Sequence, residues 1–303
     1  MINFPEIKSE IQFIQKNNEV ELFLLREDLI HPEISGNKFR KLKYNLEAYF
    51  KGKYDSILTF GGAYSNHISA TAAVGKIFKI PTIGVIRGEE LIDKINENPT
   101  LSFAQSCGMK FKFVTRSAYR NKSDPAFLEE LKSEFGNVYL LPEGGTNALA
   151  IKGTKEILHE KTKDFDYICS AVGTGGTLAG LINSAENHQI TLGFPALKDS
   201  EFLHNEINQM AQGSDFELIS EYHFGGYAKV KPELLEFINA FKQQFDVTLD
   251  AVYTGKMMFG IFQMINLGYF PKGSKVLAVH TGGIQGNQGM NQKLNFKNKK
   301  MII

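Results

Sequence analysis

The chain has 303 residues, 43% of them hydrophobic, and a formal net charge of +1. This length suits one large or two ordinary domains with a buried core, and the charge indicates neither a nucleic-acid nor a membrane-surface partner. No apolar run approaches the roughly 18 residues of a membrane span, and the first residues lack a signal-peptide layout. Two cysteines, Cys107 and Cys169, predict neither a disulfide framework nor a metal cluster. We therefore expect a soluble cytoplasmic protein without a metal site.

Short apolar runs alternate with helical patterns along the chain. Continuous apolar runs that end in Gly or a polar loop are typical of strands buried on both faces, and the alternation predicts an α/β fold with mostly parallel sheets. The predicted strands are Val20–Leu25, Ser56–Phe60, Thr82–Ile86, Lys110–Val114, Val138–Leu141, Tyr167–Val172, Thr191–Phe194 and Lys275–His280. The predicted helices are Phe39–Phe50, Asn66–Phe78, Asn98–Cys107, Asp124–Phe135, Asn147–Thr162, Thr177–Ala185, Pro232–Phe245 and Lys256–Leu267.

Lys38 lies where a loop with Gly36 and Asn37 enters a predicted amphipathic helix. Lysine is an unusual residue for such a turn unless its amine is needed, and forming a Schiff base is one such need. A plain surface cation is the alternative for this lysine taken alone. Three later glycine-containing loops follow predicted strands directly, and ligands of open parallel sheets bind beyond the carboxyl ends of the strands. All three loops could therefore face one crevice.

The first of these loops, Gly61–His67, leads into an alanine-rich helix. Ser65 or Asn66 is expected to cap this helix, and the backbone amides beyond a cap point at a bound anion. An amino-acid carboxylate would suit the loop. An ordinary strand–turn–helix cap is the structural alternative.

The second loop, Gly173–Thr177, combines three glycines with two threonine hydroxyls. Glycines let the backbone approach an anion, so we predict a phosphate site at the start of the next helix, with a tight packing turn as the alternative. A dinucleotide site fits less well, because Leu178 stands where the dinucleotide fingerprint has its last glycine.

The remaining segments carry weaker signals. The third loop, His280–Gly283, ends a strand, and His280 could be a hydrogen-bonded core histidine. A segment that superficially resembles a Walker A loop has Asp250 and Met257 at two positions where that loop requires other residues, so a nucleoside triphosphate site is not expected. The charged run Lys41–Lys43 indicates a solvated helix face, and the tail Lys293–Lys300 a solvated end.

Taken in chain order, these segments resemble the pyridoxal phosphate (PLP)-dependent family of D-cysteine desulfhydrase and 1-aminocyclopropane-1-carboxylate (ACC) deaminase. The resemblance covers most of the chain, and the combination of motifs is specific although each motif alone is not. The motifs that carry it are Arg26–Leu29, Gly36–Leu42, Gly61–His67, Glu143–Asn147, Gly173–Thr177, Val252–Lys256 and His280–Gly283.

This resemblance implies an α/β architecture of the tryptophan-synthase-β-like type, PLP fold type II, with two three-layer α/β domains. The small domain would be an insertion at residues 50–152, and residues 1–49 and 153–303 would form the large PLP-binding domain. The implied cofactor is pyridoxal 5′-phosphate. Members of the family are commonly homodimers, so a homodimer is expected here.

The resemblance also implies which residues hold the cofactor. Lys38 would form the Schiff base, Asn66 would hydrogen-bond the 3′-oxygen, and Thr254 would lie near the pyridine nitrogen. The phosphate would be held by Gly173, Thr174, Gly175, Gly176 and Thr177.

For the substrate, the resemblance implies that Ser65 and the amides of Asn66 and His67 receive the carboxylate. Tyr253 would face the substrate and could donate a proton to a leaving group, and Tyr227 matches a second active-site tyrosine more loosely. Once released from the cofactor, the Lys38 amine could act as general base, provided that burial lowers its pKa.

Two positions bear on the reaction. ACC deaminases typically carry glutamate after the active-site tyrosine and glutamine after the Ser-Asn pair, whereas this chain has Thr254 and His67, as desulfhydrase-like members do. A neutral hydroxyl near the ring nitrogen gives a weaker electron sink than a carboxylate does. Expelling hydrosulfide can proceed with this weaker sink, whereas opening a cyclopropane ring should need the stronger one. We predict α,β-elimination on a small amino acid, D-cysteine above all, giving pyruvate, ammonia and sulfide.

Other functions stay open: ACC deamination to 2-oxobutanoate and ammonia, serine or threonine dehydration or racemisation, a non-enzymatic PLP-binding protein, and a nucleotide-binding module. Binding PLP alone would not call for a carboxylate loop or a facing tyrosine, which argues against the non-enzymatic reading. The chain departs from better-known members at Ala63-Tyr64 and at Gly286–Gly289, so we expect the pocket to differ there.

Overall fold

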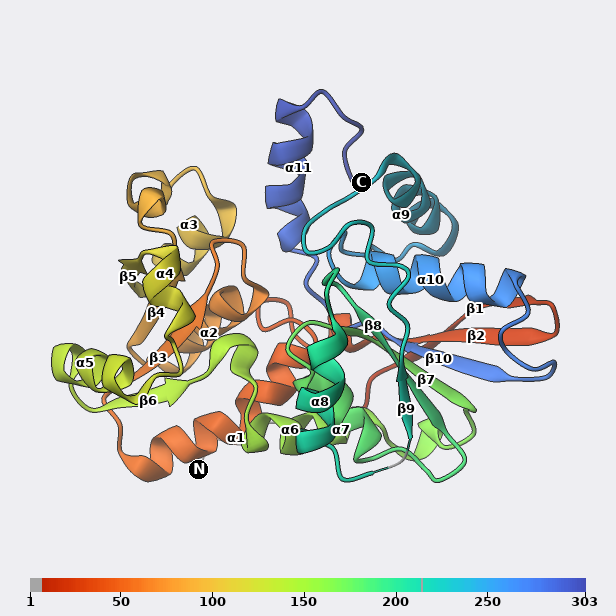
Figure 1. Ribbon diagram of the computed structural model, residues 1–303, viewed down its shortest axis with the longest axis horizontal. Coiled ribbons are helices and arrows are strands. Elements are labelled where there is room, and N and C mark those ends of the chain that lie inside the picture. The colour runs from red at the N-terminus through yellow and green to blue at the C-terminus, as the bar shows by residue number, and fades with distance from the viewer. Residues whose placement is uncertain (1–6, 214) are drawn as a thin grey trace.

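The structure is a computed structural model that describes residues 7–213 and 215–303. The first six residues lie outside the described residues. They are most of the N-terminal segment whose sequence lacks a signal-peptide layout. The chain forms two lobes, each built around one β-sheet (Figure 1). An α/β fold with mostly parallel strands is therefore confirmed.

The larger lobe contains a sheet with the strand order β1-β2-β10-β7-β8-β9. β1 runs antiparallel to β2, and every other neighbouring pair is parallel. Its strands are β1 (Ile11–Asn17), β2 (Val20–Leu25), β7 (Tyr167–Val172), β8 (Ile190–Pro195), β9 (Phe216–Leu218) and β10 (Lys275–Val279).

The smaller lobe contains a fully parallel sheet with the order β5-β4-β3-β6. Its strands are β3 (Ser56–Gly61), β4 (Thr82–Arg87), β5 (Lys110–Val114) and β6 (Val138–Leu141). All six residues of β3 are buried, as the continuous apolar pattern predicts for a central strand covered on both faces.

Helices surround both sheets. The bounds are α1 (Asn37–Gly52), α2 (Asn66–Phe78), α3 (Pro99–Ser106), α4 (Arg116–Arg120), α5 (Pro125–Phe135), α6 (Ala148–Thr154), α7 (Gly176–Ile182), α8 (Glu201–Met210), α9 (Pro232–Phe245), α10 (Thr254–Asn266) and α11 (Gly286–Phe296).

Strand β7 shows how the larger sheet is covered on both faces. Successive side chains of a strand point to opposite faces. Cys169 and Ala171 belong to the hydrophobic core formed with α9 and α10, whereas Ile168 packs in a cluster with Leu181 of α7. Helices α9 and α10 thus lie on one face and α6 and α7 on the other (Figure 1). Cys169 is buried, as its apolar context predicts.

Helix α1 packs against the smaller sheet. Leu42 and Leu46 share a hydrophobic cluster with Ile57 of β3 and Val74 of α2. By packing, therefore, α1 joins the smaller lobe, although the predicted boundary at residue 50 leaves most of it with the larger domain. All four strands of the smaller sheet lie within residues 50–152. The division into domains stays a prediction.

Most predicted elements are present, and Asn66–Phe78 and Pro232–Phe245 match residue for residue. The helix predicted over 147–162 is wrong in length: α6 ends at Thr154, because Leu158 is extended and His159 caps a separate 3₁₀ turn. The tail at 293–300 is exposed as predicted, except for Leu294. Residues 293–296 belong to α11, where Leu294 is buried.

Five strands and helices were not predicted from the sequence: β1, β9, α4, α8 and α11. β1 is an edge strand with a bulge between Phe13 and Gln15, which interrupts its alternation. β9 has only three residues. Such short or irregular elements depend on their neighbours in the fold more than on local pattern.

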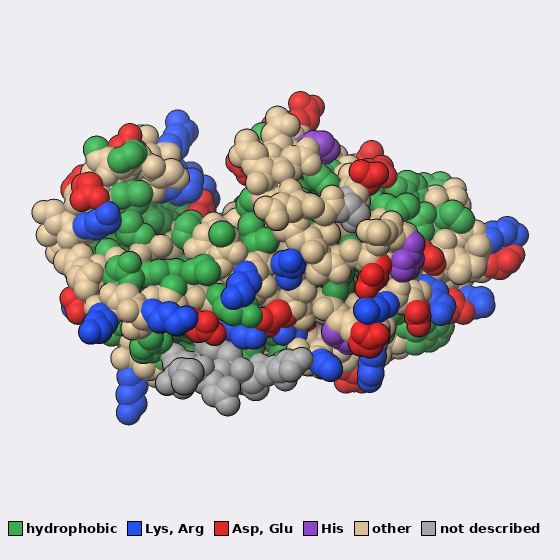
Figure 2. Space-filling model, turned by 90° about the horizontal axis from the view of Figure 1, so that it is seen from below, with side chains coloured by type: hydrophobic (Ala, Val, Ile, Leu, Met, Phe, Trp, Pro, Cys, Tyr) green, Lys and Arg blue, Asp and Glu red, His purple; other side chains and the backbone are tan. Residues whose placement is uncertain are grey.

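Basic and acidic side chains are interspersed on the face of the molecule seen in Figure 2. No large area of a single charge sign is visible on the described part of that face. Among the helices of the described residues, none is both long and apolar enough to cross a membrane.

Candidate active site

The three glycine-containing loops meet at one cavity. Each follows the carboxyl end of a parallel strand, β3, β7 or β10, where ligands of parallel sheets bind. The cavity measures about 570 Å³ and is lined by both lobes. The predicted site residues that line it are Lys38, Ser65, Asn66, His67, Gly173, Thr174, Gly175, Thr177, Tyr227 and Tyr253. Thr254 and Gly176 are not among the lining residues.

Lys38 enters the cavity from the first turn of α1. The turn before it depends on Gly36, which has φ 60° and whose Cβ would lie 1.9 Å from the Thr281 carbonyl oxygen. The Asn37 amide donates to that same carbonyl at 3.2 Å. The third loop thus fixes the backbone that directs Lys38. Burial lowers the pKa of Lys38 to about 8, so the amine is partly neutral near that pH and can act as a nucleophile.

Lys41 is a site residue that sequence reasoning missed. It is 2% exposed, which corrects the prediction of a solvated helix face for Lys41–Lys43. Its Nζ donates to the Gly144 carbonyl at 3.1 Å and to the Thr146 hydroxyl at 2.9 Å, while Lys38 Nζ lies 3.5 Å from the same Gly144 carbonyl. The spacing of three residues could have revealed it, because residues i and i+3 share one helix face.

The loop after β7 carries the predicted phosphate site. Thr174 Oγ1 lies 2.6 Å from Thr146 Oγ1, which connects this loop to Lys41. Gly175 has φ 75°, and a Cβ there would lie 2.8 Å from the Ile207 side chain. The backbone conformation of this loop therefore requires glycine at this position.

The donor set at this end of the cavity fits the phosphate of PLP. The buried Lys41 amine bonds to a carbonyl and a hydroxyl rather than to a carboxylate, and burial together with the charge of Lys38 holds its pKa well below the usual value. A buried cation without an anion is costly, and a phosphate beside it would compensate the charge. Lys38 lines the same cavity and carries a partly neutral amine. Lys41, Thr174 and the loop amides would hold the phosphate, and Lys38 would bind the aldehyde carbon.

Ser65 caps helix α2 at the carboxylate loop. Its Oγ accepts from the amides of His67 at 3.2 Å and Ile68 at 3.3 Å, as a capping serine does. The His67 amide, expected to bind the substrate carboxylate, is therefore engaged within the loop. Because Ser65 Oγ acts as acceptor in both bonds, its own hydrogen is still available to donate to an anion.

The His67 side chain is a neutral imidazole. The Thr59 hydroxyl donates to the Leu141 carbonyl at 2.8 Å, so its 2.8 Å contact with His67 Nε2 must be accepted from an Nε2–H group. Burial, followed by the charges of Lys38 and Lys41, holds the pKa of His67 well below its usual value. Nδ1 is then an acceptor without a hydrogen-bond partner among the described residues.

Asn66 bridges the first and third loops. Its Oδ1 accepts from Gln285 Nε2 at 3.0 Å, which turns the Nδ2 donor towards Gly283. A Cβ on Gly283 would lie 2.5 Å from this Nδ2. Nδ2 of Asn66 is a hydrogen-bond donor, as the expected contact with the 3′-oxygen of the cofactor requires.

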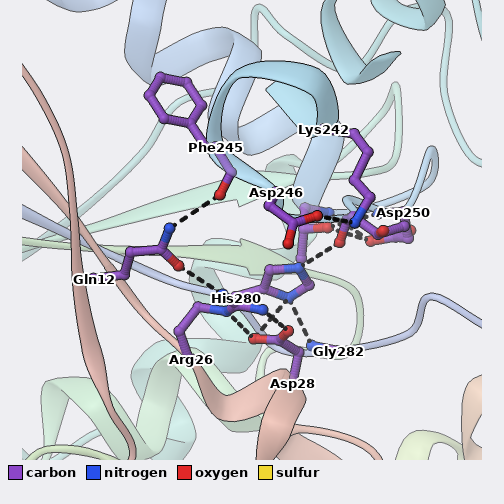
Figure 3. A network of polar contacts seen from close by, with 11 residues as sticks. Gln12, Arg26, Asp28, Lys242, Phe245, Asp246, Asp250, His280 and Gly282 are labelled. Atoms are coloured by element: carbon purple, nitrogen blue, oxygen red, sulfur yellow. Dashed lines mark hydrogen bonds and ion pairs between the residues drawn. The ribbon is translucent and has the colours of Figure 1, made fainter. Parts of the chain in front are cut away.

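His280 is a hydrogen-bonded core histidine. Its Nε2 donates to the Thr248 carbonyl at 2.8 Å and its Nδ1 accepts from the Gly282 amide at 3.2 Å (Figure 3). Both nitrogens are used, so the ring is neutral. The carboxylate of Asp28 lies 3.8 Å from Nδ1 and pairs instead with Arg26 at 2.8 Å. This network supports the third loop from behind.

Two tyrosines line the cavity. The rings of Tyr227 and Tyr253 meet edge-on with centroids 6.1 Å apart. Burial raises the pKa of both hydroxyls, so both stay protonated and can donate. The side chain of Asp250 accepts from the Tyr253 amide at 2.8 Å, which anchors the start of α10.

Thr254 is turned away from the open cavity. Its hydroxyl donates to Asp250 Oδ1 at 2.7 Å and accepts from the Asp250 amide at 3.0 Å. A ring nitrogen next to Thr254 would thus meet an oxygen whose hydrogen is already engaged. The side chain at this position is neutral, but the buried carboxylate of Asp250 lies directly behind its hydroxyl.

Arg87 and Glu143 also line the cavity and were missed by sequence reasoning. Glu143 accepts from the Tyr119 hydroxyl at 2.8 Å and pairs with Lys122 at 3.3 Å. Arg87 lies over the Tyr119 ring, 5.7 Å from its centroid. Its position could have indicated this, since Arg87 directly follows the predicted strand Thr82–Ile86 and ligands of parallel sheets bind at the carboxyl ends of the strands.

The two departures from better-known members meet in space. A Cβ on Gly289 would lie 2.4 Å from the Tyr64 ring, so α11 approaches this ring closely only because residue 289 is glycine. Tyr64 itself is half exposed at the cavity.

Within the described residues, no group of three or more His, Cys, Asp or Glu side chains could hold a metal ion.

Comparisons with known proteins agree with this geometry. The model of a family described as "Pyridoxal-phosphate dependent enzyme" matches residues 8–282. The chain is 31% identical to a putative ACC deaminase of Pyrococcus horikoshii, over 97% of this chain and 96% of the relative. It is 29% identical to a bifunctional D-cysteine desulfhydrase/ACC deaminase of Arabidopsis thaliana, over 89% of this chain and 74% of the relative.

Among solved structures, an ACC deaminase homologue superposes with a TM-score of 0.80 at 26% identity, covering 96% of this chain and 94% of that structure. The similarity includes the two-lobed arrangement and the predicted fold type II. The family match spans the loops that form the cavity. The chain therefore belongs to the family of pyridoxal-phosphate-dependent enzymes, and its cofactor is PLP.

Proposed function

We propose that this protein is a PLP-dependent deaminating lyase that removes the β-substituent of a small amino acid, with D-cysteine as the first candidate substrate. The net reaction converts D-cysteine and water into pyruvate, ammonia and hydrogen sulfide. One observation carries the choice of reaction: the residue after Tyr253 is a threonine whose hydroxyl hydrogen is engaged by Asp250. A carboxylic acid, which would strengthen the electron sink, does not stand there.

When bound, the cofactor withdraws electrons from the α-carbon of an amino acid joined to it. The chain's own residues supply orientation and proton transfer. The Ser65 hydroxyl and the start of α2 would bind the substrate carboxylate. This contact orients the α-carbon towards Lys38.

Lys38 would take the α-proton. A general base works best when its pKa lies near the operating pH, and burial lowers the pKa of this amine to about 8. Tyr253 would give a proton to the departing sulfur. The raised pKa of its hydroxyl keeps it protonated, so it can donate a hydrogen bond to the sulfur as negative charge develops there.

ACC deamination is the second candidate. It is favoured by the names of the relatives, several of which, including those of Pyrococcus horikoshii and Variovorax paradoxus, are called ACC deaminases or putative ACC deaminases. These names support ACC more than D-cysteine. The desulfhydrase activity is supported by the name of the bifunctional Arabidopsis relative and by the neutral side chain of Thr254 itself.

The test supplies the purified holoprotein with D-cysteine, β-chloro-D-alanine, D-serine or ACC. Pyruvate and 2-oxobutanoate are then measured separately. We expect pyruvate from D-cysteine, with sulfide in equal amount, and little 2-oxobutanoate from ACC. Release of 2-oxobutanoate from ACC without pyruvate from any other compound would replace the first candidate by the second. The predicted homodimer and cytoplasmic location remain predictions.

A further inference from the structure

We propose that Arg87 forms an anion subsite that receives an acidic group on the β-carbon of the substrate. The preferred substrates would then be amino acids whose β-substituent is an acidic leaving group, such as a thiol or a sulfonate, whereas a β-carboxylate, which cannot be eliminated, would be bound without reacting. The inference rests on the proposed function, because it places an amino acid in the same cavity.

Arg87 is an exposed residue that lines the cavity. It is the last residue of β4 and lines the same cavity as Lys38. Its Nη2 lies 3.6 Å from the position that a Cβ on Gly62 would take, so the guanidinium lies against the carboxylate loop. Because Gly62 has no side chain, nothing from that residue separates the guanidinium from the loop.

The guanidinium has no carboxylate partner of its own. Arg26, Arg40 and Arg116 each form an ion pair with an Asp or Glu at 2.7–2.8 Å. In the part of the chain that the structure describes, Arg87 forms none. Glu143, which also lines the cavity, is engaged by Tyr119 and Lys122. Arg87 makes only a face contact with the Tyr119 ring, which leaves its in-plane N–H donors for a ligand.

The anions that the proposed chemistry brings to the cavity do not account for Arg87. The cofactor phosphate suits Lys41 and Thr174, and the substrate carboxylate suits Ser65 at the start of α2. Arg87 is a third cationic position. Its charge also reaches the tyrosines, since it opposes the effect of burial on the pKa of Tyr227. It therefore lies near the groups that would face the β-substituent.

A guanidinium recognises a planar oxyanion through two parallel hydrogen bonds, and a compact ammonium cannot reproduce this geometry. An acidic β-substituent placed between Arg87 and the tyrosines would be bound as an anion. A sulfur leaving as hydrosulfide would meet the same positive charge. A ring carbon of ACC offers no such group.

The test measures binding rather than turnover. Holoprotein is titrated with aspartate, asparagine and alanine, each as the D and the L enantiomer, and the absorbance of the bound cofactor gives the Kd. Aspartate and asparagine have the same shape, so their ratio isolates the charge. We expect aspartate to bind roughly tenfold more tightly than asparagine, since a hydrogen bond to a charged group is worth that much or more.

Arg87→Gln should abolish this preference, Arg87→Lys should keep part of it, and alanine binding should hardly change. Arg120→Gln, which alters an exposed arginine at the end of α4 in the same lobe, is the matched control and should leave all ratios unchanged. The melting temperature of each variant reports folding. If Arg87→Gln does not fold, the salt dependence of the wild-type preference decides, because an ionic contact at an exposed arginine weakens with salt.

Two outcomes would overturn the subsite alone. An equal loss of aspartate and alanine binding in Arg87→Gln would make Arg87 a partner of the α-carboxylate. The second outcome is that aspartate and asparagine bind the wild type equally, or that the ratio of their Kd values changes neither with salt nor in Arg87→Gln. Arg87 would then be only a cation stacked on Tyr119. If no amino acid perturbs the bound cofactor, the proposed function fails and the inference fails with it.

Discussion

Lys38 and Lys256 are both mostly buried and both have a pKa lowered to about 8 by burial, yet their surroundings differ. Lys38 faces the open cavity, and its nearest acceptor, the Gly144 carbonyl, is 3.5 Å away. Lys256 donates to the carbonyls of His223 at 2.9 Å and Gly226 at 2.8 Å. A lowered pKa therefore does not by itself identify a reactive lysine. The two lysines differ in whether the amine is already engaged in close hydrogen bonds to the protein.

The loop that Lys256 holds is unusual in its backbone. Phe224, Gly225, Gly226 and Ala228 all have positive φ, a region that residues other than glycine seldom occupy. Tyr227 lies within this run and reaches the cavity. Because it holds two of the loop's carbonyls, we expect Lys256 to position Tyr227, whereas in the proposed function Lys38 would contact the reacting groups.

Replacing Lys38 should have the largest effect. In Lys38→Ala the covalent link to PLP and the general base are both lost, so the elimination rate should fall by roughly 10³-fold or more. Borohydride reduction followed by mass measurement should find PLP attached to the wild-type chain and not to the variant. Lys256→Met is the matched control and should still be labelled. Equal labelling of Lys38→Ala would show that another lysine carries the cofactor.

Lys41 should contribute less than Lys38 and mainly to cofactor affinity. Lys41→Met removes a charge-assisted contact to the phosphate, so PLP should bind roughly tenfold to a hundredfold more weakly. The apoprotein should not be destabilised in the same way, because the variant also removes a buried charge that lacks an anion. Equilibrium PLP titration and apoprotein melting temperatures test both statements. Unchanged PLP affinity would place the phosphate elsewhere.

Lys256→Met should slow turnover by only about tenfold, acting through Tyr227, while leaving PLP attached. It should also lower the melting temperature, since each buried carbonyl left without a donor costs about 1–3 kcal/mol. Comparison with Tyr227→Phe and the double variant separates the two effects. If Lys256 acts through Tyr227, the double variant should be no slower than the slower single variant. Fully additive losses in kcat would contradict the positioning role.

Much of the fold could be predicted from the sequence because the strands are continuous apolar runs and the helices have regular apolar spacing. α2 and α9 match because each has a clear periodic pattern and a definite start, at Ser65 and Pro232 respectively. The loops could be placed because each follows such a strand. The resemblance named the cofactor, and the family match supports it.

The rest depends on contacts that no local pattern contains. Lys41 has the sequence context of a surface lysine and becomes buried only because Gly144 and Thr146, about a hundred residues away, fold against it. Arg87 likewise gains significance from Tyr119 and Gly62, which it meets only in three dimensions. Thr254 shows the opposite case: the residue type was informative, but its engagement by Asp250 could not be foreseen.

The smallest expected effect is a pH dependence that distinguishes the two lysines directly. Only the neutral amine of Lys38 can attack the aldehyde of PLP, and its pKa is lowered to about 8. The rate at which the apoprotein binds PLP should therefore rise with pH and level off above 8, increasing roughly threefold between pH 7.5 and 8.5. Stopped-flow absorbance measures this rate. Lys256→Met should leave the midpoint in place, although Lys256 has a pKa in the same range. A midpoint that moves with Lys256, or one near the usual value for an exposed lysine, would mean that burial does not prepare Lys38 for the cofactor.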